Sequence, residues 1–214
     1  MDVQQIAPGL WRWTARHPDW TPEEGGPDGW EPDVASVYLE GDDAVVMIDP
    51  QVPGEPGERH RFLEALDRDL RRAGKPLAVL ITVRWHGRSA DYLRERYPDV
   101  TVWARDDVVD AVATHRFAPG DALPAGVEAI DAGRAHEVVF WIPRHRTLVA
   151  GDALLGAAGG GLRPIPDSWV DDAAVEKVRA ALLALLDLPV DTVVVTHGEP
   201  VLGEGADALR RALA

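Results

Sequence analysis

The order of the expected elements predicts an α/β fold in which helices cover the faces of sheets. Two short apolar runs, at 35–40 and 44–48, are typical of a strand pair. Charged helical segments then alternate with buried strands, and a second strand pair precedes a helix, a strand and a terminal helix. Elements in this order pack as sheets covered by helices, because each sheet must bury its apolar side.

The segment between 58 and 104 predicts a strand–helix–strand unit. Residues 58–73 have apolar side chains at helical spacing among charged ones, and Gly74 ends the pattern where a C-terminal glycine would. The run 77–83 is continuously apolar, as expected for a strand buried on both faces. A helix at 89–97 then leads into a strand at 100–104.

The second half of the chain predicts another hairpin and two more helices. The stretch 162–169 contains two prolines and cannot be a regular helix, so we expect a surface loop near a site. No internal repeat or linker divides the chain, and residues 1–214 are expected to form one domain. The other expected elements are a short helix at 107–114, strands at 137–142, 147–150 and 190–196, and helices at 171–186 and 205–214.

Composition and charge narrow the function. The chain has 36 acidic and 22 basic residues, for a net charge of -14, which argues against nucleic acid or an anionic membrane surface as a partner. No window holds about 18 consecutive apolar residues, and the first ten residues lack the pattern of a leader. We expect a cytoplasmic protein with a small-molecule substrate; the oligomeric state is left open.

Any metal site must use His, Asp or Glu ligands, because the chain contains no cysteine. Seven histidines are available. Those at positions 17, 60, 115 and 145 lie in polar or helical surface contexts, so they are interpreted as solvated. Asp49, directly after a buried strand, is interpreted as a brace for neighbouring loops rather than a chemical group.

Four local patterns carry a family resemblance. They are a strand ending Ile48-Asp49-Pro50, a buried strand running into 81–89, the run 140–152 ending Gly151-Asp152, and the run 193–200 containing His197-Gly198. In this order they resemble the metallo-β-lactamase superfamily. Its members have a strand ending in I-D, an H-x-H-x-D-H loop, a later histidine, a strand ending in G-D and a final strand ending in H-G.

The resemblance spans nearly the whole chain and implies a four-layer αββα sandwich with a metal site at one edge of the two sheets. The H-x-H-x-D-H motif is degenerate here. Arg84 stands at the first histidine, His86 matches the second, and Arg88 and Ser89 replace the aspartate and the last histidine. A two-metal mechanism is therefore not expected, because Arg88 takes the place of a carboxylate that holds the second ion.

The resemblance implies four candidate metal ligands: His86, His136, Asp152 and His197. Of these, His86, His136 and Asp152 would form a two-histidine, one-carboxylate set, which can hold one divalent ion, most simply zinc, with open positions for water. His86 and Asp152 are also the candidate catalytic residues. The implied activity is hydrolysis of a small ester, lactone, thioester or related acyl substrate at a site with at most one metal.

The arginines support an alternative without metal. A guanidinium is always charged, and at about 4 Å from another unit charge it interacts by roughly 4 kcal/mol at an effective dielectric of 20. Arg84 and Arg88 would then replace the metal's charge in a non-catalytic or anion-binding relative. In either case we expect Arg84 and Arg88, together with Trp85 and Trp169, to contact the ligand. The other tryptophans expected in or near loops are equally well explained by packing at the sheet edges: Trp11, Trp13, Trp20 and Trp30.

Overall fold

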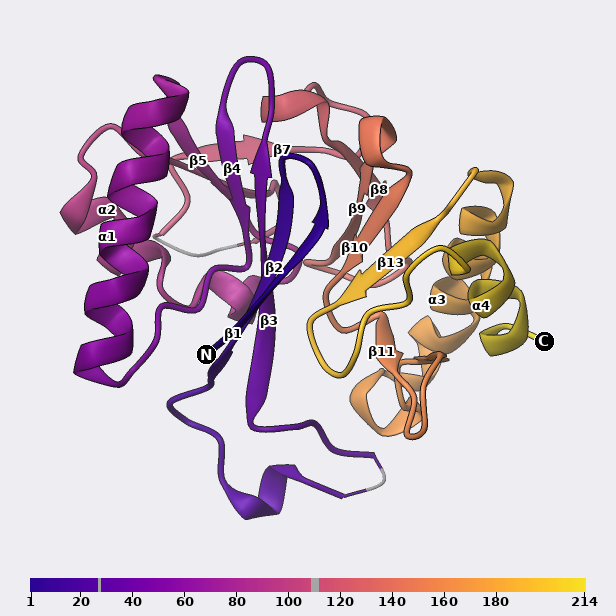
Figure 1. Cartoon of the computed structure of the whole chain (residues 1–214). Coiled ribbons are helices and arrows are strands. Elements are labelled where there is room, and N and C mark those ends of the chain that lie inside the picture. Colours follow the sequence, from indigo (N-terminus) through magenta and orange to yellow (C-terminus); the bar gives the residue numbers. More distant parts are fainter. Residues whose placement is uncertain (27, 109–111) are drawn as a thin grey trace.

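The structure is a computed structural model and describes residues 1–26, 28–108 and 112–214. Its larger sheet has seven strands, arranged in the order of the chain from β1 to β7 (Figure 1). The first four are antiparallel neighbours, and each later strand is parallel to the one before it. The strands are β1 (Asp2–Ala7), β2 (Leu10–Arg16), β3 (Asp33–Glu40), β4 (Val45–Ile48), β5 (Leu77–Leu80), β6 (Thr101–Arg105) and β7 (His115–Phe117).

The second sheet has four strands in the order β13-β10-β9-β8. β9 and β10 form the expected hairpin, and β13 is parallel to β10. A separate pair, β11 and β12, follows β10. The strands are β8 (Glu128–Asp131), β9 (Val138–Ile142), β10 (Thr147–Ala150), β11 (Leu154–Gly156), β12 (Leu162–Pro164) and β13 (Thr192–Val195).

Helices cover the outer faces of both sheets, which gives four layers (Figure 1). The α-helices are α1 (Pro56–Ala73), α2 (Ala90–Arg96), α3 (Asp172–Ala184) and α4 (Gly205–Ala212). Short 3-10 helices lie at η1 (Pro22–Glu24), η2 (Arg84–Gly87), η3 (Pro124–Gly126), η4 (Pro143–His145), η5 (Asp167–Trp169) and η6 (Leu185–Asp187). None of the helices in the described ranges combines the length and apolarity needed to cross a bilayer.

Side chains alternate between the two faces of each strand, so one strand contributes to two hydrophobic cores. In β4, Val46 and Ile48 face the core between the two sheets, whereas Val45 and Met47 face the core beneath α1 and α2. Successive strand residues point to opposite faces, so a continuously apolar strand is buried on both. A third core lies between the four-stranded sheet and the helices α3 and α4.

Most expected elements are confirmed, with their ends shifted by a few residues. The strands β1 and β2 were not expected, and Trp11 and Trp13 lie in β2 rather than in loops. The stretch 162–169 is not a regular helix, as expected, and forms β12 and η5. Residues 109–111 of the short helix expected at 107–114 lie outside the described residues.

Candidate functional site

The site lies where strands of the two sheets end side by side. Asp49 follows β4, His86 lies in η2 after β5, Asp152 follows β10 and His197 follows β13. The backbone N–H of Ala35 donates to the carbonyl of residue 196 at 2.8 Å, and that of residue 138 donates to the carbonyl of residue 82 at 2.8 Å. These bonds tie one sheet to the other and bring the four strand ends together.

Three buried side chains meet at this edge. The Nε2 atoms of His86 and His197 each lie 3.3 Å from the same oxygen, Oδ1 of Asp152. One ligand atom from each residue lies within 4.8 Å of the other two, so the group could hold a metal ion. His86, Asp152 and His197 are only 2%, 3% and 8% exposed, so water screens their charges weakly.

Asp49 fixes the orientation of His86. Its carboxylate accepts the backbone N–H of Thr82 at 2.8 Å and the Thr82 hydroxyl at 2.5 Å. Its Oδ2 also lies 2.9 Å from Nδ1 of His86. A carboxylate at Nδ1 favours a proton on that nitrogen, which leaves Nε2 as the nitrogen directed at Asp152. Asp49 therefore braces the loops, as expected, and also orients His86 toward Asp152.

Asp152 is held from its other side. The indole N–H of Trp85 donates to Oδ2 at 2.5 Å, so Oδ1 is the oxygen turned toward the histidines. Oε1 of Glu137 accepts the backbone N–H groups of Asp152 and Ala153 at 2.8 and 2.7 Å. A Cβ at Gly151 would lie 2.5 Å from Oγ1 of Thr82, so this glycine lets the two loops approach closely.

Charged side chains surround the histidine–aspartate group. Arg134 pairs with Oε2 of Glu137 at 3.1 Å. The Trp85 ring has the guanidinium carbons of Arg84 at 5.2 Å and of Arg134 at 5.0 Å from its centroid. Arg88 donates to the carbonyls of Ala35 and Asp49, both at 3.3 Å. In the described part of the chain, Asp152 pairs with the two histidines and with neither Arg84 nor Arg88.

The surroundings of His86 and His197 shift the pKa values of the two side chains in opposite directions. Burial and Arg88 lower the pKa of His86, but the carboxylates of Asp152 and Asp49 outweigh them, so its pKa is raised. Burial is the main reason that the pKa of His197 falls to about 4. Although burial opposes ionisation, the charge of His86 and bonds from both histidines hold the pKa of Asp152 well below its ordinary value.

Glu137 behaves differently from Asp152. Burial, followed by repulsion from Asp152, raises the pKa of its carboxyl to about 7. The Arg134 charge and the two backbone bonds act in the opposite direction. Because Glu137 is 0% exposed, its remaining oxygen depends on Arg134 rather than on solvent.

The donor set fits one divalent ion. Oδ1 of Asp152 is buried, and its polar neighbours in the described part of the chain are the two imidazole Nε2 atoms, each at 3.3 Å. In the metal-free chain the raised pKa of His86 favours a proton between its Nε2 and Oδ1 of Asp152, and a metal ion would take the place of that proton. A tetrahedral zinc site with ligand distances of about 2.0–2.1 Å has ligand-to-ligand edges of about 3.3–3.4 Å. The two observed separations of 3.3 Å match such edges.

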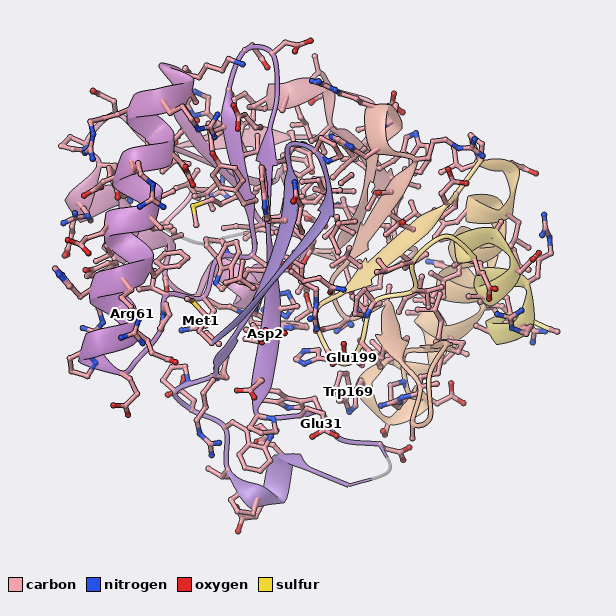
Figure 2. The ribbon with its side chains drawn as sticks, in the orientation of Figure 1. Met1, Asp2, Glu31, Arg61, Trp169 and Glu199 are labelled. Atoms are coloured by element: carbon pink, nitrogen blue, oxygen red, sulfur yellow. The ribbon has the colours of Figure 1, made fainter. Side chains whose placement is uncertain are left out.

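The group lies in a cleft of about 1050 Å³. The candidate residues Trp85, His86, Arg88, Asp152, Trp169 and His197 all line it. Figure 2 labels Trp169 close to Glu31, and Trp30, the residue before Glu31, lines the same cleft as Trp169. The ring centroids of Trp169 and His197 are 6.3 Å apart.

The structure does not bring two of the candidates to this group. His136 has a positive φ of 64° and its Nδ1 lies 3.5 Å from Asp107, outside the histidine–aspartate group. The next residue, Glu137, is the one directed into the buried site. Arg84 is exposed on the ring of Trp85 and is not among the residues that line the cleft.

Sequence reasoning missed several residues of the site. Arg134 and Glu137 support Asp152 from a segment that offers no local motif. His17, interpreted as solvated, lines the cleft with Trp30, whose ring centroid is 5.2 Å from that of His17 and 5.0 Å from that of His197. The aromatic composition of this N-terminal segment was the available signal, because tryptophans clustered in a loop often line a pocket.

Solved structures share this fold. A metallo-beta-lactamase from Pontibacter korlensis superposes with a TM-score of 0.72 at 16% identity, covering 99% of this chain and 96% of that one. The metallo-beta-lactamase DIM-1 gives 0.70 at 12% identity, covering 99% and 94%. A metallo-beta-lactamase family protein from Thermus thermophilus gives 0.63 at 15% identity, covering 98% and 79%.

These superpositions show that the chain has the metallo-beta-lactamase fold over nearly its whole length, as the resemblance implied. At such low identity they show the fold alone. No protein-family model matches the sequence, and no curated protein matches it.

Proposed function

We propose that this chain, with its metallo-beta-lactamase fold, is a hydrolase of small esters, lactones, thioesters or related acyl substrates that uses one divalent metal ion. The observation that supports this most strongly is the buried Oδ1 of Asp152, which lies 3.3 Å from the Nε2 atoms of both His86 and His197. This group lies in a cleft of about 1050 Å³, which is large enough for a small acyl compound.

His86, Asp152 and His197 would hold the ion, and zinc suits two imidazoles and a carboxylate at these separations. When bound, the ion supplies acidification of water and polarisation of the acyl carbonyl. The reaction adds water to the acyl carbon and breaks its bond to the leaving oxygen or sulfur. The proton lost by the water ends on the leaving alcohol or thiol.

The chain's own residues orient the parts of this reaction. Asp49 keeps the Nε2 lone pair of His86 directed into the site, and Trp85 keeps Oδ1 of Asp152 turned toward it. Trp169 lines the cleft and excludes water from one wall. Arg88 carries a fixed positive charge beside Asp49, where the resemblance implies a carboxylate, so we propose a single ion rather than two.

The test is metal content combined with turnover. Protein purified without a histidine tag is stripped with chelator and offered zinc, iron and manganese at equal concentration. We expect about one ion per chain and hydrolysis of simple thioesters only in the loaded protein. Asp152→Asn should remove both. A loaded wild type that hydrolyses no acyl substrate would refute the proposed activity.

A matched control comes from an aspartate–histidine pair outside the site. Asp107 pairs with His136 outside the proposed site, and its side chain is 33% exposed. Asp107→Asn removes the same charge as Asp152→Asn, and we expect it to leave the metal content at one ion per chain. Equal loss in both variants would point to a general effect of charge rather than to ligation.

A second candidate function is a metal-free site that binds an anion. The observation in its favour is Arg88, whose charge lies among the site residues and acts on Asp49 and Asp152. In this case a proton shared by His86 and Asp152 would take the place of the ion. The metal experiment separates the two, because a metal-free site would hold no ion after reconstitution.

A further inference from the structure

The mouth of the cleft differs in charge from its floor. The segment between β2 and β3 lies over the cleft and contributes four carboxylates to its lining, Asp19, Glu23, Glu24 and Asp28. All four side chains are exposed, so they surround the entrance rather than the buried histidine–aspartate group.

These carboxylates have no basic partner. Within residues 1–26, 28–108 and 112–214, none of the four forms an ion pair with a lysine or an arginine. Glu24 accepts the indole N–H of Trp30 at 3.1 Å, which places a negative charge against an aromatic wall of the cleft. Two arginines contact the same segment, Arg16 over the Trp20 ring at 5.3 Å and Arg163 at the carbonyl of Gly29 at 3.1 Å. Four carboxylates against two guanidinium groups leave the entrance with a net negative charge.

The floor of the cleft is balanced instead. Arg134 is paired with Glu137 at 3.1 Å, and Arg88 donates to two carbonyls and interacts with Asp49 and Asp152. At the floor, Oδ1 of Asp152 lies between the two imidazole Nε2 atoms, and Nδ1 of His197 is buried without a hydrogen-bond partner among the described residues. This end of the cleft holds the proposed metal ligands His86, Asp152 and His197 and suits the acyl group.

We infer that the substrate of this cleft is an acyl compound whose leaving group carries a cationic ammonium group, held at the mouth beside Glu23, Glu24 and Trp30. This inference rests on the proposed function and adds the substrate class. Clefts lined by one sign of charge concentrate ligands of the opposite sign and speed their association by about 10-fold or more. Aromatic rings next to carboxylates also attract alkylammonium groups.

The experiment compares three thioesters with the same acetyl group on zinc-loaded protein. Acetylthiocholine carries a trimethylammonium group, 3,3-dimethylbutyl thioacetate has the same shape without charge, and the thioacetate of 3-mercaptopropionate is anionic. We expect kcat/KM to be about tenfold higher for the cation than for the neutral thioester at low salt. This ratio should shrink to about twofold in 0.5 M NaCl, where charges are screened within a few ångströms.

Matched variants locate the effect. Glu23→Gln with Glu24→Gln removes two charges at the mouth and keeps an acceptor for Trp30. Glu95→Gln with Glu128→Gln removes two exposed charges that do not line the cleft. The ratio of cationic to neutral kcat/KM should fall about fivefold in the first pair alone. An equal fall in both pairs, or a wild-type ratio near one, would overturn the inference.

Binding provides a readout that does not depend on turnover. Tryptophan fluorescence of metal-free protein is titrated with choline and with 3,3-dimethylbutanol, its uncharged isostere. Saturable quenching by choline alone supports the inference, and equal responses contradict it. If choline binds but the loaded protein hydrolyses none of the thioesters, the proposed activity fails while the cation site remains.

Discussion

Replacing Asp49 by Asn tests whether the chain prepares His86 as a metal ligand. The variant keeps an oxygen for the backbone N–H of Thr82 but places an NH₂ group where Oδ2 now lies 2.9 Å from Nδ1 of His86. Two donors then face each other, so the ring must move its proton to Nε2. That proton would point at Asp152 and would have to leave before a metal could bind.

The size of the effect follows from these contacts. Loss of a partner that orients a ligating histidine typically costs 10–100-fold in metal affinity, or about 1.4–2.7 kcal/mol. The free energy of unfolding should fall by about 1–3 kcal/mol, because the Thr82 hydroxyl loses the Asp49 oxygen to which it donates. The hydroxyl can instead rotate to accept from the new amide, which limits the loss. The variant should therefore stay folded.

The assay is competition for zinc against a chelator, with urea unfolding measured on the same samples. Nitrogen NMR of the imidazole rings reports the tautomer of His86 directly. Asp107→Asn is the matched control, because Asp107 contacts a histidine outside the site. An Asp49→Asn protein that is folded and binds zinc as tightly as wild type would refute this reasoning.

Three further predictions concern the other parts of the site. His197→Ala should abolish zinc binding measured by mass spectrometry and His136→Ala should not, so equal loss in both would contradict the assigned ligands. Trp85→Phe removes the 2.5 Å bond to Asp152 and should lower the free energy of unfolding by about 1–2 kcal/mol in urea; no change would show that this bond is not stabilising. In the folded protein the pKa of Glu137 is raised from its ordinary value of 4.5 to about 7. The protonated carboxyl therefore contributes fully to the free energy of unfolding below about pH 4.5, and this contribution is lost as the pH rises to about 7. In metal-free protein, the stability of Glu137→Gln relative to wild type should therefore rise by up to about 3 kcal/mol between pH 4.5 and 8, and a pH-independent difference would contradict the raised pKa.

Local patterns predicted much of the fold. The apolar run 44–48 and the helical spacing of 58–73 gave the strand β4 and the helix α1 within a few residues. The strands β1 and β2 were not predicted, because Trp11 and Trp13 were interpreted as loop residues. In the structure Trp13 is 4% exposed and packs beneath α1, where its ring centroid lies 5.4 Å from that of Phe62.

The candidate site was predictable only where a motif fixes a strand end. Asp152 and His197 follow buried strands within recognisable patterns, and the structure brings both to His86. His136 and Glu137 are adjacent, and the positive φ of His136 decides which of them enters the site. No sequence pattern reveals such a single-residue choice, because it depends on how the loop meets the other sheet.

Contacts between distant segments were beyond sequence reasoning as well. Trp30 contacts His197, and His17 contacts Trp30, because the segment between β2 and β3 lines the same cleft as His197. Arg84 aligns with a ligand position of the resemblance, yet its side chain stacks on Trp85 instead. Side-chain direction in the η2 turn sets that outcome.

The most direct test of the central claim is anomalous diffraction at the zinc edge from crystals loaded with one equivalent of zinc. We predict a single strong peak about 2.0–2.2 Å from Nε2 of His86, Nε2 of His197 and Oδ1 of Asp152. A peak elsewhere, such as at His136 and Asp107, or no peak at all, would contradict the claim that these three residues form a metal centre.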